Sequence, residues 1–489
     1  MTKNLLVKIG LFTFIFLLSL KVITDTDLGW HIRVGEYILK TLSVPKTDLF
    51  SFSQPDYPYV YHSWATELII FASYKWLGLW GITLLYASII TLSVFYLYRT
   101  SVLINGKINY LLFLWVAPLA FAFAGGRTRA MGFLLLSILY LLFVKFQLKN
   151  SRAIWLAPLI FFLWANLHGS FILGFGVFAV LIATLRFFPK ENQNRPKFKS
   201  LLIIFFFSLV STLATPYFFG AWKQAVVMTL NSTLALRSTN LDWKSLVEPS
   251  GGGLIFATIV AVVIFMLFFS KSKVSKIQKF LLLLFFILSL LTARFALPLL
   301  IFFVPIANQF LEDLKSRLNK QVLNSTSIKG FVSVLYLVLS LSVLINLIET
   351  NFANRSFNEY SYYLEKFSSA RLLYPPWPYE ANLFIQENLP DMRILAEANW
   401  GGYMIWLNPG QKVFYWGAMD NFIVNGRSFV FEYLNIINTK PNWEEKLNQY
   451  KIDAVFLPKE FPLVAVLNLR EDWQKVYDRQ DVVIFTKRN

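Results

Sequence analysis

The sequence predicts an α-helical polytopic membrane protein that ends in a C-terminal α/β domain, and composition and pattern support this fold class. Hydrophobic residues make up 56% of the 489 residues and aromatic residues 18%, whereas only 15% are charged. Soluble domains carry about 25% charged residues. Apolar runs recur until Ile348, after which strand and helix patterns alternate. These features exclude a soluble enzyme, a disordered chain and a small anchor on a large soluble body.

The apolar runs predict about eleven membrane-spanning helices. The first run, residues 5–23, lacks a small-residue cleavage site behind it, which favours an uncleaved span over a signal peptide. The other predicted spans are residues 80–98, 108–124, 131–147, 154–167, 171–188, 201–214, 254–269, 280–291, 295–310 and 331–348. Several are shorter than the roughly 20 residues that a crossing needs. Residues 67–77 fit the membrane interface as well as a span.

Charge predicts the orientation of the chain. The formal net charge is +18, which in a soluble protein would suggest a nucleic-acid partner. Here Lys and Arg cluster in alternate short loops, which predicts cytoplasmic loops next to anionic headgroups and no nucleic acid. The N-terminus is then cytoplasmic, and an odd number of spans makes the C-terminal domain extracytoplasmic. The sequence has no cysteine, which excludes disulfides and cysteine ligands or nucleophiles.

The chemically distinctive residues fall on the predicted outer face. Ionisable groups at membrane depth are costly and usually line an aqueous cavity, so we expect these residues to meet in one cavity. The candidates are Asp25, Asp27, His31, His62 and Glu67 in or just behind the first outer loop (residues 24–66), and Arg127, Arg129, His168, Glu248 and Arg294 at later outer turns.

Less specific roles compete for some of these residues. Arg127 and Arg294 also fit headgroup anchors, His62 fits an ordinary interface histidine, and Trp30 fits the interfacial aromatic belt. Asp25 and Asp27 fit such roles least, because they neither cap a predicted helix nor match a neighbouring basic cluster.

The residue types indicate group transfer from a lipid-linked phosphate. A carboxylate at the rim of the bilayer can act as general base on an acceptor, and basic side chains can hold the phosphate of the donor. Asp25 and Asp27 can alternatively hold a divalent cation such as Mg²⁺ or Mn²⁺. The sequence has no Gly-rich phosphate loop, so no nucleotide or organic cofactor is expected.

The C-terminal residues predict a linker over 350–378 and a small mixed α/β domain over 379–489. Helices are expected at residues 379–388, 429–437 and 443–450, and strands at 393–397, 412–416, 453–457 and 482–486. Gly401-Gly402 predicts a turn or a helix start rather than a binding loop. The domain suits acceptor binding or cover of an active site, and no catalytic role is assigned to it.

The motifs of the outer loops resemble those of bacterial polytopic proteins related to GT-C glycosyltransferases. The matching residues are Asp25-x-Asp27-x-x-Trp30-His31, Gly35-Glu36, Pro45-x-x-Asp48, His62-x-Trp64-x-x-Glu67, Asn166-x-His168-Gly169, Pro216-Tyr217, Arg294 and Trp400-Gly401-Gly402-Tyr403. The resemblance spans most of the chain. Its first-loop motif is fairly specific, and the other motifs are weak alone.

The resemblance implies a sugar transferase that uses a polyprenyl-phosphate or polyprenyl-diphosphate donor on the outer face. Asp27, or Asp25 in second place, would be the catalytic base. The donor phosphate would lie on Arg127, Arg129 or Arg294, and the histidines His31, His62 and His168 would complete the pocket. The acceptor would be a glycan, a lipid or a protein.

This sequence departs from that pattern at two positions. Gly29 stands where the pattern has an aromatic residue, and Leu28 stands where other GT-C branches have an acidic one. These departures leave the donor and the metal requirement open. The alternatives are a transporter or flippase of a lipid-linked saccharide and a non-catalytic envelope assembly factor. A transporter is disfavoured because the predicted spans contain almost no ionisable residues near their middles.

Overall fold

The structure of the chain is a computed structural model, which describes residues 3–21, 23, 25–124, 126–187, 196–230, 244–248, 251–269, 274–317, 378–479 and 481–488. These residues form two compact units. The first unit comprises residues 1–21 and 83–349, and the second comprises residues 22–82 and 350–489. The first outer loop therefore packs with the C-terminal residues, although most of the chain separates them in sequence.

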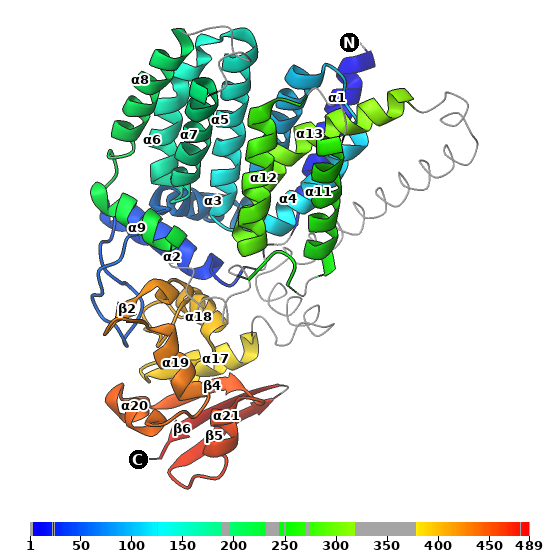
Figure 1. Ribbon diagram of the computed structural model, residues 1–489. Coiled ribbons are helices and arrows are strands. Elements are labelled where there is room, and N and C mark those ends of the chain that lie inside the picture. Colours follow the sequence, from blue (N-terminus) through cyan, green and yellow to red (C-terminus); the bar gives the residue numbers. More distant parts are fainter. Residues whose placement is uncertain are drawn as a thin grey trace, which may run out of the picture. The chain divides into compact units, whose positions relative to one another are not determined.

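The first unit is helical throughout its described part (Figure 1). Its helices are α1 (Lys3–Ser19), the later part of α3 (Trp64–Asn105), α4 (Tyr110–Ala124), α5 (Arg129–Lys149), α6 (Ala157–Leu167), α7 (Phe171–Phe187), α8 (Pro196–Ser211), α9 (Phe219–Leu230), α11 (Gly251–Phe269), α12 (Lys276–Leu291) and α13 (Ala296–Arg317), with 3₁₀ turns η1 (Arg152–Leu156) and η4 (Ala293–Phe295).

Aromatic side chains fill the space between these helices. Phe161 on α6 is fully buried, and its ring centroid lies 4.2 Å from that of Phe175 on α7 and 6.0 Å from that of Trp164. Figure 1 shows α6, α7 and α8 as neighbours, in agreement with their contacts. This aromatic packing explains why so many Phe and Trp residues lie in the predicted spans.

Each predicted span on described residues overlaps a helix. Three helices in the described part are long and apolar enough to cross a membrane: Trp64–Asn105, Arg129–Lys149 and Ala293–Asp313. The apolar helices at Leu5–Ser19, Tyr110–Ala124, Arg152–Leu167, Phe171–Phe187, Phe198–Ser211 and Phe256–Phe265 are shorter. The count of about eleven spans stays a prediction, and the predicted span 331–348 and linker residues 350–377 lie outside the described residues.

Helix α3 is interrupted at one glycine. Its 42 residues are about twice what a membrane crossing needs. Gly78 divides it with a non-helical backbone at φ 58° and ψ −145°, a conformation that glycine adopts readily. The predicted span 80–98 begins directly behind this break, and residues 64–77 form a separate helical segment.

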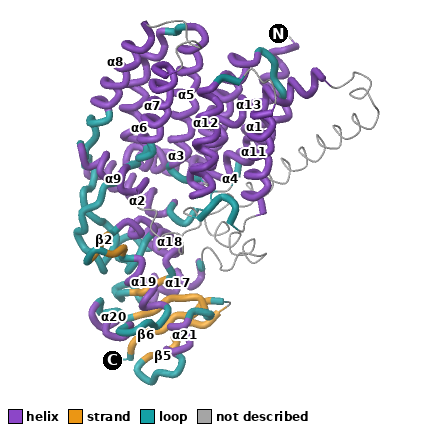
Figure 2. The backbone as a smooth tube through the Cα atoms, in the orientation of Figure 1, coloured by secondary structure: helices purple, strands orange, loops and turns teal. Residues whose placement is uncertain are grey.

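The second unit combines α and β structure, and Figure 2 shows that all described strands belong to its C-terminal residues. Four strands form one sheet in the order β1-β4-β6-β5, in which β1 and β4 are parallel and the other pairs are antiparallel. The strands are β1 (Ile394–Ala396), β2 (Ile423–Val424), β3 (Arg427–Ser428), β4 (Ala454–Pro458), β5 (Trp473–Arg479) and β6 (Val482–Lys487).

The helices of this unit come from both ends of the chain. They are α2 (Leu28–Thr41), the first part of α3, α17 (Tyr379–Asn388), α18 (Gly401–Leu407), α19 (Val430–Ile437), α20 (Trp443–Gln449) and α21 (Pro462–Leu467), with 3₁₀ turns η5 (Ala398–Trp400) and η6 (Gly417–Asn421). Its core runs along the buried strands β4 and β6, where Phe456 and Ile484 face each other fully buried.

The predicted strand at residues 412–416 is wrong. Val413 forms only an isolated bridge, and its partner is Ser51 of the first outer loop. The amide of Val413 donates to the carbonyl of Phe50 at 2.9 Å, and the amide of Phe52 donates to the carbonyl of Val413 at 3.0 Å. The apolar run has strand character, but it pairs with the first outer loop instead of joining the sheet.

Candidate functional site

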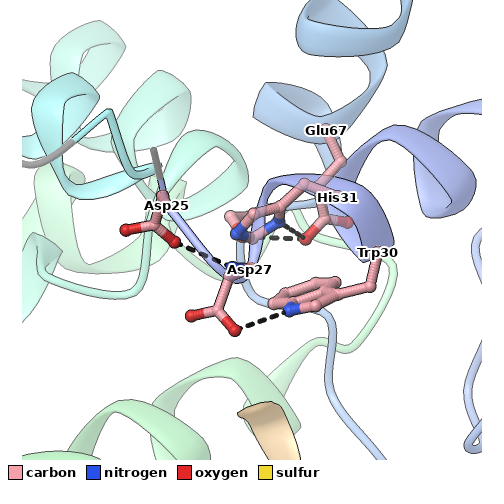
Figure 3. A network of polar contacts seen from close by, with 6 residues as sticks. Asp25, Asp27, Trp30, His31 and Glu67 are labelled. Atoms are coloured by element: carbon pink, nitrogen blue, oxygen red, sulfur yellow. Dashed lines mark hydrogen bonds and ion pairs between the residues drawn. The ribbon is translucent and has the colours of Figure 1, made fainter. Parts of the chain in front are cut away.

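Asp25 and Asp27 stand at the start of α2, where the chain turns into the helix (Figure 3). Oδ1 of Asp25 accepts a hydrogen bond from the amide of Asp27 at 2.9 Å, which is an Asx-type turn. Asp27 occupies the N-cap position, and its carbonyl accepts the amide of His31 at 3.2 Å. The sequence pattern did not reveal α2, so no helix was predicted behind these residues, whereas the structure places Asp27 at the N-cap of one.

The Asp27 carboxylate does not cap α2 with its side chain. Instead, Oδ1 accepts a hydrogen bond from Nε1 of Trp30 at 3.0 Å, as Figure 3 shows. The carboxylate is partly exposed, and within the described residues no hydrogen bond reaches its Oδ2 atom. The positive end of the helix dipole at this position favours the negative charge. Asp27 thus presents one fixed and one available oxygen.

His31 and Glu67 form a buried pair between α2 and the first turn of α3. Nδ1 of His31 lies 3.1 Å from Oε1 of Glu67, which also accepts the hydroxyl of Ser63 at 3.0 Å. Oε2 of Glu67 is buried and has no hydrogen-bond partner among the described residues. The ring of His31 stacks at a tilt on Trp30, with centroids 3.6 Å apart. Oε1 of Glu67 thus holds Nδ1 of His31, and the substrate-binding role predicted for Glu67 stays a prediction.

Asp48 joins the first outer loop to the C-terminal residues. Its carboxylate accepts the amides of Phe50 and Ser51, each at 3.0 Å, and Nε1 of Trp416 at 3.1 Å. Asp48 is buried, and burial raises its pKa, although hydrogen bonds from Ser51 and Phe50 act against this shift. Asp48 belongs to the motif that resembles GT-C relatives, but the sequence predicted no role for it. Nothing in the sequence marked Trp416 as a candidate residue.

Five of the predicted site residues lie in the second unit: Asp25, Asp27, His31, His62 and Glu67. The structure brings Asp25 next to Asp27 and His31 next to Glu67. His62 is partly buried in the turn just before α3, where its amide donates to the carbonyl of Val60 at 2.9 Å.

The other five predicted site residues lie in the first unit: Arg127, Arg129, His168, Glu248 and Arg294. Nε of Arg129 donates to the carbonyl of Ala124, the last residue of α4, at 2.9 Å. Arg127 lies in the turn before α5, Arg294 lies in η4, and Glu248 is exposed. The predicted common cavity stays a prediction.

His168 ends α6 and takes part in a local polar network. Its Nδ1 lies 2.7 Å from the hydroxyl oxygen of Ser170 and accepts the amide of Ser170 at 3.1 Å. The same hydroxyl oxygen accepts Nε1 of Trp164 at 3.1 Å. Gly132 on α5 leaves room for this network, because a Cβ atom there would overlap the Ser170 hydroxyl.

A divalent cation would have few protein ligands in the described part of the chain, which contains no group of three or more His, Asp or Glu side chains suited to a metal. Mg²⁺ is often held by one or two carboxylates together with water and substrate phosphates. Asp25 and Asp27 fit that arrangement, although each already accepts one N–H. Mg²⁺ or Mn²⁺ binding stays a prediction, as does the absence of a nucleotide or organic cofactor.

Glu397 was not a predicted site residue, yet it is the most perturbed carboxyl group in the α/β part. It follows β1, and its carboxylate accepts the amide and the side-chain amide of Asn399 at 2.7 and 3.0 Å. Burial raises its pKa to about 7. A lone Glu in front of Asn399-Trp400 carries no sequence signal for this, because the burial comes from tertiary packing.

Comparisons with known proteins give a match only among solved structures. No family model matches the sequence, and a search of curated proteins finds no match. The apo crystal structure of the Archaeoglobus fulgidus oligosaccharyltransferase matches with a TM-score of 0.57 at 11% identity, over 92% of this chain and 69% of that chain.

A second structure shares the same coverage. An archaeal oligosaccharyltransferase from Archaeoglobus fulgidus, in complex with an inhibitory peptide and a dolichol-phosphate, matches with a TM-score of 0.42 at 12% identity. The likeness to the apo structure, and not the weaker second match, shows that this chain has a GT-C-like fold, as the outer-loop motifs predict.

Proposed function

We propose that this chain is an integral membrane glycosyltransferase that moves a sugar from a polyprenyl-phosphate-linked donor to an acceptor at the extracytoplasmic face. The observation that carries the proposal is the Asp27 carboxylate. It stands at the N-terminus of a helix, with Oδ1 held by Trp30, in a chain of GT-C-like fold. An oriented carboxylate with a second, available oxygen is what a general base requires.

In the proposed reaction, Oδ2 of Asp27 takes the proton from the hydroxyl or amine of the acceptor. The acceptor atom then attacks the anomeric carbon of the sugar. The bond between this carbon and the phosphate oxygen breaks, and the polyprenyl phosphate, or diphosphate, leaves with the electron pair. A fixed Oδ1 keeps the basic oxygen in one orientation and so lowers the entropic part of the barrier.

Asp25 is proposed as a second candidate for the base and as the residue that shapes the turn. Its Oδ1 is already used by the amide of Asp27, and the residue is buried. A carboxylate that closes a turn is less available for proton transfer than its partly exposed neighbour. Replacing it should therefore lower activity by disturbing the turn, whereas replacing Asp27 should remove the base.

The remaining residues are proposed to bind the donor and to order the site. Guanidinium groups suit phosphate because their N–H donors match its oxygens, so Arg127, Arg129 and Arg294 are proposed for the leaving phosphate. His31, His62 and His168 are proposed as further pocket residues. Glu67 would act through His31, and the exposed Glu248 would contact the acceptor or the sugar.

The test is transfer from a panel of undecaprenyl-phosphate-linked radiolabelled hexoses and pentoses by the full chain in lipid nanodiscs. Asp27→Asn should lose at least about 100-fold in rate, the usual scale for a general base, with unchanged thermal unfolding. Asp56→Asn is the matched control, because Asp56 is exposed and its backbone at φ 59° also suits asparagine. Full transfer by Asp27→Asn would overturn the role of Asp27 as base.

A further inference from the structure

Glycines line the contact between the start of α2 and the C-terminal residues of the same unit. A Cβ atom at Gly402 would overlap the carbonyl oxygen of Thr26, and one at Gly29 would overlap the carbonyl oxygen of Gly402. A Cβ atom at Gly401 would overlap the carbonyl oxygen of Tyr415. Only glycine allows backbone to approach backbone this closely. Helix α18 therefore lies directly against the turn that carries Asp27.

Gly417 differs from these glycines in what it makes room for. A Cβ atom there would overlap Oδ1 of Asp27, the oxygen that accepts Nε1 of Trp30. Gly417 is the first residue of η6, two positions behind Tyr415. Burial raises the pKa of Tyr415, and the negative charges of Asp420 and Asp27 add to this shift. The segment 415–417 thus forms a wall that lies against one side of the Asp27 carboxylate.

Trp416 connects this wall to the first outer loop. Its ring centroid lies 5.0 Å from that of Trp30 in an edge contact, and its Nε1 donates to Oδ1 of Asp48 at 3.1 Å. Each of the two tryptophans therefore donates to one aspartate, and their rings touch. Both indoles bury a large apolar area and lose their freedom to rotate. The contact fixes Trp30, and Trp30 fixes Oδ1 of Asp27.

We propose that Gly417 and Trp416 are positioning residues for Asp27, so that the C-terminal domain completes the reaction centre instead of covering it. The inference rests on the proposed function, in which Asp27 is the base. Catalytic groups need to be held within about 0.5 Å of their productive position. Gly417 leaves the space in which the carboxylate sits, and Trp416 restrains the residue that holds it.

The sharpest variant is Gly417→Ala in the full chain. The atom that the new methyl group would overlap is the end of a side chain and not backbone, so the fold can accept the change by displacing the carboxylate from its hydrogen bond with Trp30. A displacement near 1 Å costs about 100-fold in rate. We expect kcat to fall by about that factor, while the KM for the undecaprenyl-phosphate-linked sugar changes less than about twofold.

The matched control is Gly176→Ala on α7, because nothing lies within 4 Å of a Cβ atom there. Gly417→Ala should show the same thermal unfolding midpoint as the parent chain, and Gly176→Ala the same or a higher one. A purely structural role of Gly417 would lower that midpoint or change kcat and KM together. A full kcat for Gly417→Ala, in a chain that Asp27→Asn inactivates, would overturn the inference and leave the proposed function intact.

A second measurement decides the inference without any substrate. Hydrogen–deuterium exchange should become faster in residues 25–33 of Gly417→Ala and stay unchanged in Gly176→Ala, because displacing Asp27 disturbs the turn that its amide and carbonyl close. Unchanged exchange in residues 25–33 would overturn the inference. If the parent chain transfers none of the sugars in the panel, the proposed function loses its support, while the exchange result still stands.

Discussion

Nδ1 of His31 and Oε1 of Glu67, which are 36 residues apart in sequence, lie 3.1 Å apart in a buried pair that joins α2 to α3. The same oxygen accepts the hydroxyl of Ser63. α2 and the start of α3 also approach closely at Gly35, where a Cβ atom would overlap the carbonyl oxygen of Glu67. Glu67 therefore contacts α2 twice, with its carboxylate at His31 and with its backbone carbonyl at Gly35.

Replacing Glu67 tests this pair. Glu67→Ala removes the acceptor of two buried donors, and each unsatisfied buried group costs about 1–3 kcal/mol. Glu67→Gln keeps an oxygen in the place of Oε1 and should lose much less. Thermal unfolding of the chain in detergent measures the difference, with the exposed Glu387→Ala as control. Equal losses in the Ala and Gln variants would contradict an acceptor role.

Trp416→Phe tests the link between the first outer loop and the C-terminal residues. The variant keeps a ring next to Trp30 but loses the donor to the buried Asp48 carboxylate. We expect a loss of about 1.5–3 kcal/mol in unfolding free energy, the range for a hydrogen bond to a charged group. Trp443→Phe, at a partly exposed helix start, is the control. The two variants should also differ in protease cleavage within residues 42–60, and equal cleavage would contradict the link.

The fold was predictable where apolar runs decide the structure. The runs in the first unit coincide with helices, and the buried strands β4 and β6 match predicted strands within one or two residues. Strand β5 was missed because it contains Gln474, Lys475 and Asp478 and lies at the edge of the sheet, where polar residues are tolerated. Residues 412–416 were assigned to the sheet because local strand character does not reveal which partner a segment takes.

The candidate site was predictable where its residues belong to one sequence motif. The motif from Asp25 to Glu67 contains the Asp25–Asp27 turn and the His31–Glu67 pair. Gly417 and Trp416 could not be found in this way, because they meet Asp27 and Asp48 only through the packing of the C-terminal residues. Gly29, a departure from the motif, has a physical reason that becomes visible only next to Gly402.

Gly29→Ala should destabilise the chain although it places a better helix former inside α2. Alanine gains about 1 kcal/mol over glycine in a free helix interior, but here its Cβ atom would overlap the carbonyl oxygen of Gly402 and meet Cβ of Trp406 at 2.9 Å. Displacing a backbone carbonyl costs more free energy than displacing the end of a side chain. We expect a lower unfolding midpoint for Gly29→Ala and an unchanged or higher one for Gly176→Ala. A rise in both would show that α2 and α18 do not touch in this way.

Glu397 should make stability depend on pH. Its pKa is about 7 in the folded chain against an ordinary value of 4.5. Below pH 4.5 the group is protonated in both states and has no effect. Between these values only the unfolded chain loses the proton, so stability falls by about 1.4 kcal/mol per pH unit. Above pH 7 the carboxyl group is ionised in both states, so the loss of stability grows no further.

Glu397→Gln should therefore remove part of the loss in thermal stability between about pH 5 and pH 7. The variant keeps an oxygen for the amide of Asn399 but has no proton to lose. Glu387→Gln, on the exposed face of α17, controls for the change in net charge. Parallel pH curves for the parent chain and Glu397→Gln would show that the carboxyl group is not shielded from water.

Single cysteines test the predicted orientation, because the natural sequence has none. Leu42 is 88% exposed in the first outer loop, and Lys107 is exposed in a loop that the positive-inside rule places in the cytoplasm. In intact cells, a membrane-impermeant maleimide should label Leu42→Cys and leave Lys107→Cys unlabelled until the membrane is opened. The backbone of Leu42 has a φ of 53°, which is as unfavourable for cysteine as for leucine. Leu42→Cys should therefore be as stable as the parent chain. The reverse labelling pattern would place Asp27 on the cytoplasmic side, where the proposed transfer at the outer face cannot occur.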